Sequence, residues 1–158
     1  MNKIIFFIIV LILSGCNEKN KSFQRKASIF NGITLLKTEK FDGTISKKEN
    51  YFIYKYISQQ DSSKTISVKF NKVSNDLYFG SEEFGRKNKR VFTEPNLSKN
   101  DFALYDLKDP YPDGTGPILF NQEYGLLAIY NTFGPTIIFL SDKEDKNLKE
   151  RVLKVLQN

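Results

Sequence analysis

The sequence predicts an α+β or mainly β domain, in which a curved antiparallel sheet of seven to nine short strands is closed by one C-terminal amphipathic helix. Three observations predict it. Short apolar or alternating segments recur between turn signals, no helical pattern separates them, and the one helical pattern comes at the end of the chain. Strands that follow one another without intervening helices favour antiparallel pairing.

The first half of the chain gives the clearest strands. Residues 29–38 form an apolar stretch broken by the turn signal Asn31-Gly32, and Phe41-Asp42-Gly43 indicates a second turn. Residues 51–58 alternate so that one face carries Phe52, Tyr54 and Tyr56. After the polar turn 59–64, residues 66–70 form the return strand of a hairpin.

The second half is cut into shorter pieces. The expected strands are 76–80, 89–93, 101–107, 117–120, 124–131 and 136–140. The segment 81–88 is expected to connect the first two, and 109–117, with three prolines and two glycines, is expected to be irregular.

The C-terminus predicts a helix of about four turns. Ser141 to Glu144 fits a capping box. Leu148, Val152, Val155 and Leu156 then recur at helical spacing, with Leu153 beside them. This apolar face should lie on the sheet.

Composition excludes several kinds of chemistry. The chain has 158 residues, which is the size of one domain, with no histidine and one cysteine. Histidine-based catalysis, histidine-ligated zinc and an intrachain disulfide are therefore excluded, and no metal site or cofactor is expected. An enzyme is less expected than a binding protein.

The N-terminus has the pattern of an export signal. Lys3 precedes an apolar run of about ten residues, which is too short to span a bilayer. The run ends in Leu13-Ser14-Gly15-Cys16, which resembles the lipobox of bacterial lipoproteins. The resemblance covers residues 1–16 and implies cleavage between Gly15 and Cys16, with lipid attached to Cys16. Two or more acyl chains would hold the protein on a membrane.

The resemblance also divides the chain. Residues 1–15 would be the signal peptide, 16–27 the lipidated cysteine with a flexible basic tether, and 28–158 a single globular domain. The tether carries a net charge of +3 over residues 17–26, which suits anionic headgroups. Asn17 departs from the aspartate that marks inner-membrane retention in proteobacterial lipoproteins, which favours the outer membrane if the host is Gram-negative.

A small lipocalin-like β-barrel is the alternative fold, because eight strands followed by a helix resembles the order of that family. The chain departs from the family's G-x-W signature, since it has no tryptophan.

Two segments are candidates for interaction. Arg86, Lys87, Lys89 and Arg90 form a basic cluster expected at a hairpin connection, where it would meet an acidic partner or a lipid surface. Tyr111 lies at the centre of the Pro/Gly-rich loop, where prolines would present it at low entropic cost. A solvated edge and a plain turn are the simpler explanations.

Candidate catalytic residues are restricted to carboxylates, and none is assigned. The acids that a glycan hydrolase could use are Glu82, Glu83, Asp106, Asp109 and Asp113. Tyr54, Tyr56, Tyr78 and Tyr105 are candidates for either a ligand-facing wall or the core.

Three functions follow as hypotheses. The first is a membrane-anchored envelope lipoprotein with a non-enzymatic binding domain for an envelope protein, of which an inhibitor or immunity role is a specific form. The others are a small lipophilic-ligand carrier and a carboxylate-dependent glycan hydrolase. Nucleic acid is not an expected partner.

Overall fold

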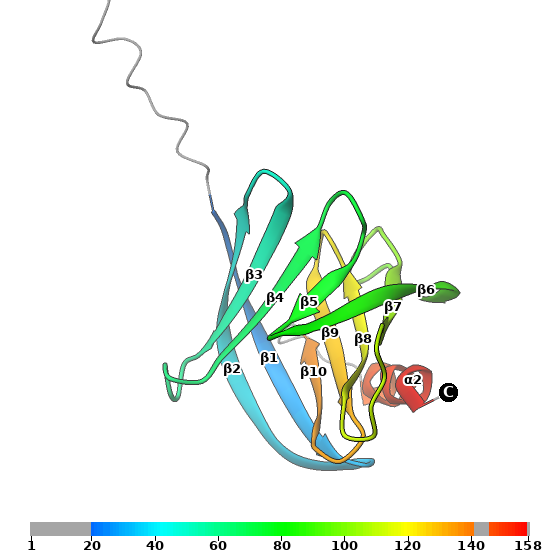
Figure 1. Cartoon of the computed structure of the whole chain (residues 1–158). Helices are drawn as coiled ribbons and strands as arrows, with labels where there is room; N and C mark the ends of the chain where they lie inside the picture. Colours follow the sequence, from blue (N-terminus) through cyan, green and yellow to red (C-terminus); the bar gives the residue numbers. More distant parts are fainter. Residues whose placement is uncertain (1–19, 141–145, 158) are drawn as a thin grey trace, which may run out of the picture.

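A computed structural model describes residues 20–140 and 146–157, apart from the side chains of residues 88, 89 and 146. The expectations for residues 1–19, including Gly15, Cys16 and Asn17, and for the capping box at 141–144 lie outside the described residues. The described chain forms a closed barrel of ten strands with one helix on its outer surface (Figure 1).

The strands follow one another around the barrel in chain order, each antiparallel to its neighbours, and β1 closes the ring by pairing with β10. They are β1 (Lys21–Asn31), β2 (Thr34–Lys47), β3 (Tyr51–Ser58), β4 (Thr65–Asn71), β5 (Leu77–Phe79), β6 (Glu82–Phe92), β7 (Phe102–Leu107), β8 (Thr115–Asn121), β9 (Gly125–Asn131) and β10 (Thr136–Leu140).

The predicted fold class is therefore confirmed, in the form of its closed-barrel alternative. The curved antiparallel sheet of seven to nine strands and the eight strands of the lipocalin order both undercount the ten strands present. Closure depends on the pairing of Ile29 with Ile137, which are far apart in the chain. Local patterns carry no information about such a pairing, whereas they do identify each strand.

Aromatic side chains fill the barrel interior. Tyr54, Tyr56 and Phe70 project inward and are almost fully buried. Their rings pack on two further rings, edge to face for Tyr54–Phe120 with centroids 5.0 Å apart, stacked for Phe70–Phe120 at 5.5 Å and tilted for Tyr56–Phe139 at 4.9 Å. The alternation expected for residues 51–58 is thus confirmed, and these tyrosines belong to the core.

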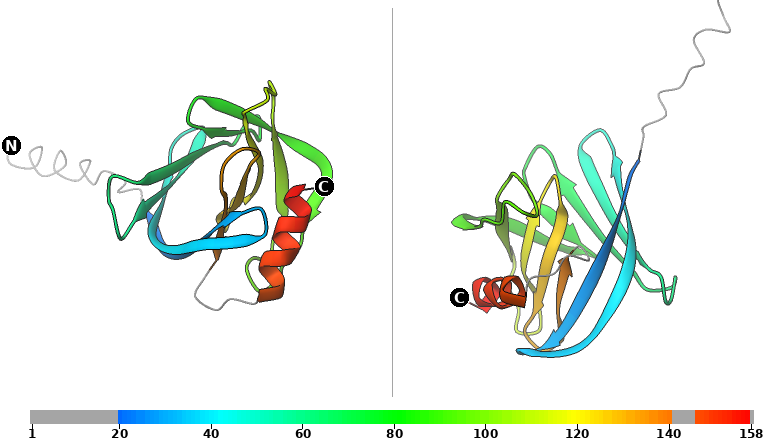
Figure 2. Two further views of the ribbon diagram at one scale, coloured as in Figure 1. Left: turned by 90° about the horizontal axis from the view of Figure 1, so that it is seen from below. Right: turned by 180° about the vertical axis from the view of Figure 1, so that it is seen from behind.

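A second core lies outside the barrel, under helix α2 (Lys146–Gln157) (Figure 2). Leu148, Val152, Leu153 and Leu156 of the helix are buried, as the helical spacing predicted, and Val155 is partly buried. They cover the outward residues of β7 to β10, which include Phe102, Leu104, Leu119, Leu127 and Ile138. Because these strands are buried on both faces, their sequences are nearly continuous apolar runs.

Residues 21–27, which the sequence placed in the flexible tether, belong to β1. Phe23 packs against the inner core and Ala27 is buried in it. Gly43, expected in a turn, lies within β2 directly opposite Phe23. A Cβ at Gly43 would collide with the Phe23 ring, and this glycine therefore makes room for an aromatic side chain.

The segment 81–88 was also predicted wrongly as a connection. Residues 82–92 form one strand, β6, whose first three residues pair with β5 and whose later part pairs with β7. The sequence did not indicate a strand here, because charged side chains on the outer face of β6 make the segment look like a polar connection.

Candidate functional site

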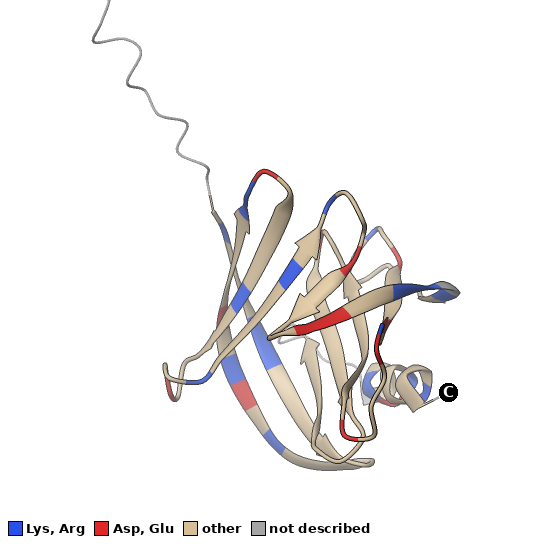
Figure 3. Ribbon diagram, in the orientation of Figure 1, with Lys and Arg blue, Asp and Glu red and all other residues tan. Residues whose placement is uncertain are grey.

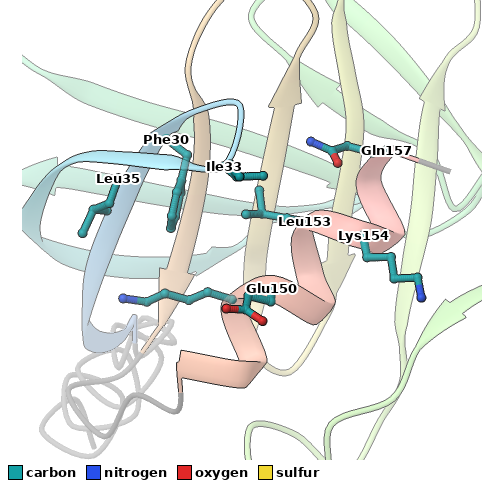
Figure 4. Close-up of a pocket in the computed structure, with 8 residues that line it drawn as sticks. Phe30, Ile33, Leu35, Glu150, Leu153, Lys154 and Gln157 are labelled. Atoms are coloured by element: carbon teal, nitrogen blue, oxygen red, sulfur yellow. The ribbon is translucent and has the colours of Figure 1, made fainter.

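An apolar groove lies between the β1–β2 hairpin tip and α2 (Figure 4). Its volume is about 660 Å³. Phe30, Ile33 and Leu35 line it from the hairpin, and Leu153 lines it from the helix. Phe30 and Leu153 are buried at its base, whereas Ile33 is 82% exposed at its edge. The rim is polar, with Lys149, Glu150, Lys154 and Gln157.

Further exposed apolar side chains belong to the same end of the barrel. Leu36 is 57% exposed in the strand that leaves the hairpin tip. Phe133 is 76% exposed in the β9–β10 turn, close to the hairpin because Phe30 pairs with Thr136. Exposed aliphatic and aromatic residues that form one contiguous patch often mark a binding site, whereas single exposed apolar residues are common on any protein surface.

The groove lies at the end of the barrel opposite the first described residues. β1 begins at one rim and ends at the hairpin tip (Figure 1). Its 11 residues extend roughly 35 Å along the strand, at about 3.3 Å per residue, from one rim to the other. Anything that holds the N-terminus to a surface therefore leaves the groove facing away from that surface.

Acidic and basic positions are distributed over the barrel strands and turns (Figure 3). Three of the expected acidic residues, Glu82, Glu83 and Asp106, form ion pairs or hydrogen bonds instead of a catalytic pair. Glu83 accepts hydrogen bonds from Lys108 at 2.7 Å and from Tyr78 at 3.1 Å. Asp106 pairs with Lys87 on the outer face. Glu82 accepts a hydrogen bond from Tyr111. Each of these carboxylates therefore has its own hydrogen-bond or ion-pair partner.

Lys108 is the centre of this charge network. Its ammonium also contacts Asp76 at 2.8 Å, and the hydrogen bonds to Asp76 and then Glu83 raise the pKa of Lys108. Burial opposes ionisation of Asp76, but the hydrogen bonds from Lys108 and Ser74 and the positive charge of Lys108 together outweigh it, and the pKa of Asp76 is lowered. Both groups stay charged at neutral pH, which suits a structural ion pair and not proton transfer. Asp109 and Asp113 lie exposed in the β7–β8 loop.

The basic cluster is not a hairpin connection and does not form one surface. It lies within β6, where the pairing with β7 is interrupted by a bulge between Arg86 and Val91. Arg86 faces a pocket at the barrel mouth, whereas Lys87 pairs with Asp106 outside. Arg90 is half-buried, and the side chain of Lys89 lies outside the described residues.

Tyr111 is 52% exposed, as the loop prediction required, but its hydroxyl donates to Glu82. This hydrogen bond raises the pKa of Tyr111. Tyr111 lies near the rim that carries the tip of the β1–β2 hairpin, at the other end of the barrel from the pocket that Arg86 faces. Of the four tyrosines considered as a wall, Tyr54, Tyr56 and Tyr105 are buried inside the barrel, and Tyr78 is partly exposed.

The groove residues were missed by sequence reasoning. Ile33, Leu35 and Leu36 were counted in an apolar strand, and the only available signal was that three such residues lie within four positions after the turn glycine Gly32. Leu153 was identified as a core residue, which is also its role here. The groove exists because barrel closure brings the hairpin beside a helix from the other end of the chain.

No helix in the described part of the chain is both long and apolar enough to cross a bilayer. Within residues 20–140 and 146–157, no group of three or more His, Cys, Asp or Glu side chains could hold a metal ion. Comparison of the chain with protein-family models, curated proteins and solved structures found no match.

Proposed function

We propose that this protein is a lipid-anchored protein of the bacterial cell envelope, in the outer membrane if the host is Gram-negative, that acts by binding and not by catalysis. The observation that carries the binding role is the apolar groove beside α2, with Ile33 82% exposed at its edge. The anchoring role rests on the lipobox pattern that ends at Cys16.

The groove fits a protein partner that presents an apolar side chain or short apolar segment. Its base is aliphatic and aromatic, and the flanking Leu36 and Phe133 extend the apolar area beyond it. Two lysines and one glutamate on the rim give it a net positive charge. Acidic residues beside the apolar segment of the partner would therefore add to affinity and association rate.

The position of the groove agrees with the proposed anchor. Acyl chains at Cys16 would lie close to the rim where β1 begins, and the groove would face away from the membrane. Four residues, 17–20, separate Cys16 from Lys21, and this short link would keep the barrel near the bilayer surface.

Anchoring is tested by fractionating cells that produce the protein or its Cys16→Ala variant, with palmitate labelling of both. We expect label and membrane association in the first and neither in the second. Membrane retention of the unlabelled variant would contradict a lipid anchor. Equal thermal unfolding of the two proteins shows that the substitution acts on anchoring alone.

Binding is tested with a photo-crosslinking amino acid at position 33, compared with the same amino acid at position 73. Val73 is the matched control, because it is 77% exposed but lies at the other rim. We expect one stoichiometric protein adduct from position 33 only. The Ile33→Glu variant should weaken binding of that purified partner by about tenfold or more, and Val73→Glu should not. Equal effects of the two would remove the groove from the interface.

A small lipophilic ligand is the second candidate occupant of the same groove. The volume of about 660 Å³ lies within the range of small-molecule sites. The barrel interior is a less suitable place for such a ligand, because packed aromatic rings occupy it. Recovery of an apolar small molecule with the purified protein, without a protein adduct from position 33, would favour this candidate.

A further inference from the structure

The barrel rim where β1 begins is the part of the folded domain that a lipid anchor would hold closest to the membrane. The chain between Cys16 and Lys21, the first residue of β1, consists of residues 17–20. A fully extended chain covers at most about 3.6 Å per residue, so Lys21 can lie no more than about 18 Å from the lipidated cysteine. The side chains on this rim therefore face the bilayer surface at short range.

Two turns project from this rim, between β2 and β3 and between β4 and β5 (Figure 1 and Figure 2). The backbone N–H of Lys72 in the second turn donates to the carbonyl of Asn50 in the first at 2.9 Å. The ammonium of Lys72 donates to the carbonyl of Lys48 at 2.7 Å. These hydrogen bonds join residues 47–50 and 72–75 into one surface, which we call the docking turns.

Val73 lies at the tip of the second docking turn and is 77% exposed. The turn does not require an apolar side chain at this position. The side chain of Asn71 fixes the turn instead, because it accepts hydrogen bonds from the backbone N–H of Val73 at 2.9 Å and of Ser74 at 3.3 Å. Val73 is thus free to enter an apolar phase without any change in the fold.

Lysines surround this valine. Lys47 and Lys48 are exposed in the first docking turn, Lys72 precedes Val73, and the exposed Lys21 begins β1 on the same rim. The ammonium groups of Lys47 and Lys48 make no ion pair within residues 20–140 and 146–157. Glu49 is the only acidic residue in the docking turns, so these turns and Lys21 together carry a net charge of +3. Such a surface is attracted to anionic headgroups.

The short link to the anchor favours lipid over protein as the occupant of this surface. A folded domain of 100 residues has a radius of gyration of about 13 Å, so its diameter exceeds the 18 Å or less that the link allows between Lys21 and the lipidated cysteine. The bilayer itself is at hand, and an apolar tip among lysines is complementary to its interface, which is anionic at the headgroups and apolar beneath them.

We propose that the docking turns bind the anionic membrane surface on which the protein is anchored. Val73 enters the interfacial region, and Lys47, Lys48 and Lys72 contact lipid phosphates. The proposal rests on the lipid anchor proposed above and adds a second contact, made by the folded domain. This contact fixes the orientation of the barrel, with the apolar groove directed away from the membrane.

The test uses the lipidated protein, purified from membranes and reconstituted in vesicles of phosphatidylcholine with about 30% phosphatidylglycerol. Cys16 is the only cysteine and its thiol is acylated in the proposed anchor, so Asn50→Cys supplies a single site for a thiol-specific fluorophore. Ile33→Cys, at the opposite rim, is the matched control site. A nitroxide on the lipid acyl chains, close to the headgroup, quenches fluorophores that reach the interface.

We expect quenching at position 50 to be at least about threefold stronger than at position 33. It should fall by about half or more when phosphatidylcholine replaces phosphatidylglycerol, because the lysines then lose their anionic partners. The anchor holds the protein on both kinds of vesicle, so this difference reports the docking turns and not the acyl chains.

Variants of the labelled protein separate the two parts of the docking turns. Val73→Ser, and the double variant Lys47→Gln with Lys48→Gln, should each lower quenching at position 50 by about half or more. The double variant Lys40→Gln with Lys64→Gln is the matched control, because it removes the same charge from exposed positions near the β3–β4 turn, at the other end of β3. It should leave the quenching unchanged.

Quenching at position 50 that does not depend on phosphatidylglycerol, on Val73 or on Lys47 and Lys48 would overturn the proposal, since the anchor alone would then position the barrel. Equal losses from the two double variants would also overturn it, because they would show an effect of net charge and not of this surface. Failure of the anchor is recognised separately, by the absence of palmitate label from the protein before any vesicle is made.

Discussion

The hydroxyl of Tyr56 in β3 accepts a 2.7 Å hydrogen bond from the backbone N–H of Leu126 in β9. Both residues are fully buried, and the bond crosses the barrel between strands that do not pair. The preceding residue, Gly125, has a φ of 89°, and a Cβ there would lie 2.5 Å from the same hydroxyl. The β8–β9 turn is therefore fitted to a tyrosine side chain from the far wall.

Tyr56→Phe should lower the free energy of unfolding by about 1–3 kcal/mol, because the N–H of Leu126 would be left buried without an acceptor. Urea unfolding at pH 7 measures the change. Tyr51→Phe is the matched control, since it removes a hydroxyl from the same strand at a half-exposed position. Equal effects of the two substitutions would show that the cross-barrel bond contributes nothing.

Phe23→Ala should cost about 2 kcal/mol of stability, because the ring packs on the inner core and lies over Gly43. Ser22→Ala, at the neighbouring exposed position, should change stability by less than about 0.5 kcal/mol. Thermal or urea unfolding of both variants tests where the folded domain begins. If Phe23→Ala left the free energy of unfolding unchanged, residues up to 27 would belong to a flexible tether and not to the folded domain.

Local patterns predicted those parts of the fold that depend on neighbouring residues. The strand 51–58 and the apolar face at Leu148 and Val152 were read correctly, since alternation and helical spacing reflect burial directly. The start of β1 was missed because basic residues surround Phe23, and Gly43 was taken for a turn because its role depends on the opposite strand.

The candidate sites were harder to predict, because each is assembled from distant segments. Arg86 and Lys87 are adjacent in sequence, yet one faces a pocket and the other an ion pair. Conversely, Ile33 and Leu153 lie near opposite ends of the chain and line one groove. A cluster in sequence is therefore a poor guide to a cluster in space on a strand, where alternate residues separate.

Glu39 should make stability depend on pH. It is 3% exposed, and a hydrogen bond from Ser58, followed by one from Lys37 at 2.9 Å, lowers the pKa of Glu39 below its ordinary value of 4.5. A carboxylate whose pKa is lower in the folded state stabilises the fold above pH 4.5, and this contribution is lost as the pH falls through the folded value.

Glu39→Gln should therefore be less stable than the parent protein at pH 7, and the difference should shrink as the pH is lowered towards about 3. Urea unfolding at both pH values measures it, with Glu49→Gln in the exposed β2–β3 turn as the control. A deficit that stays constant between the two pH values would show that packing, and not ionisation, explains the effect of the substitution.

The outer core under α2 should be as necessary for the stability of the fold as the inner core of the barrel. Val152 is fully buried between α2 and the barrel wall, whereas Lys154 on the same helix is exposed. Val152→Asp would place a carboxylate without a partner in that layer and should cost about 3 kcal/mol or more. Lys154→Asp should cost less than about 1 kcal/mol, mainly through the helix dipole. Urea unfolding of both variants compares them. If Val152→Asp unfolded like Lys154→Asp, the barrel would be stable without the helix, and the apolar runs in β7 to β10 would need another explanation.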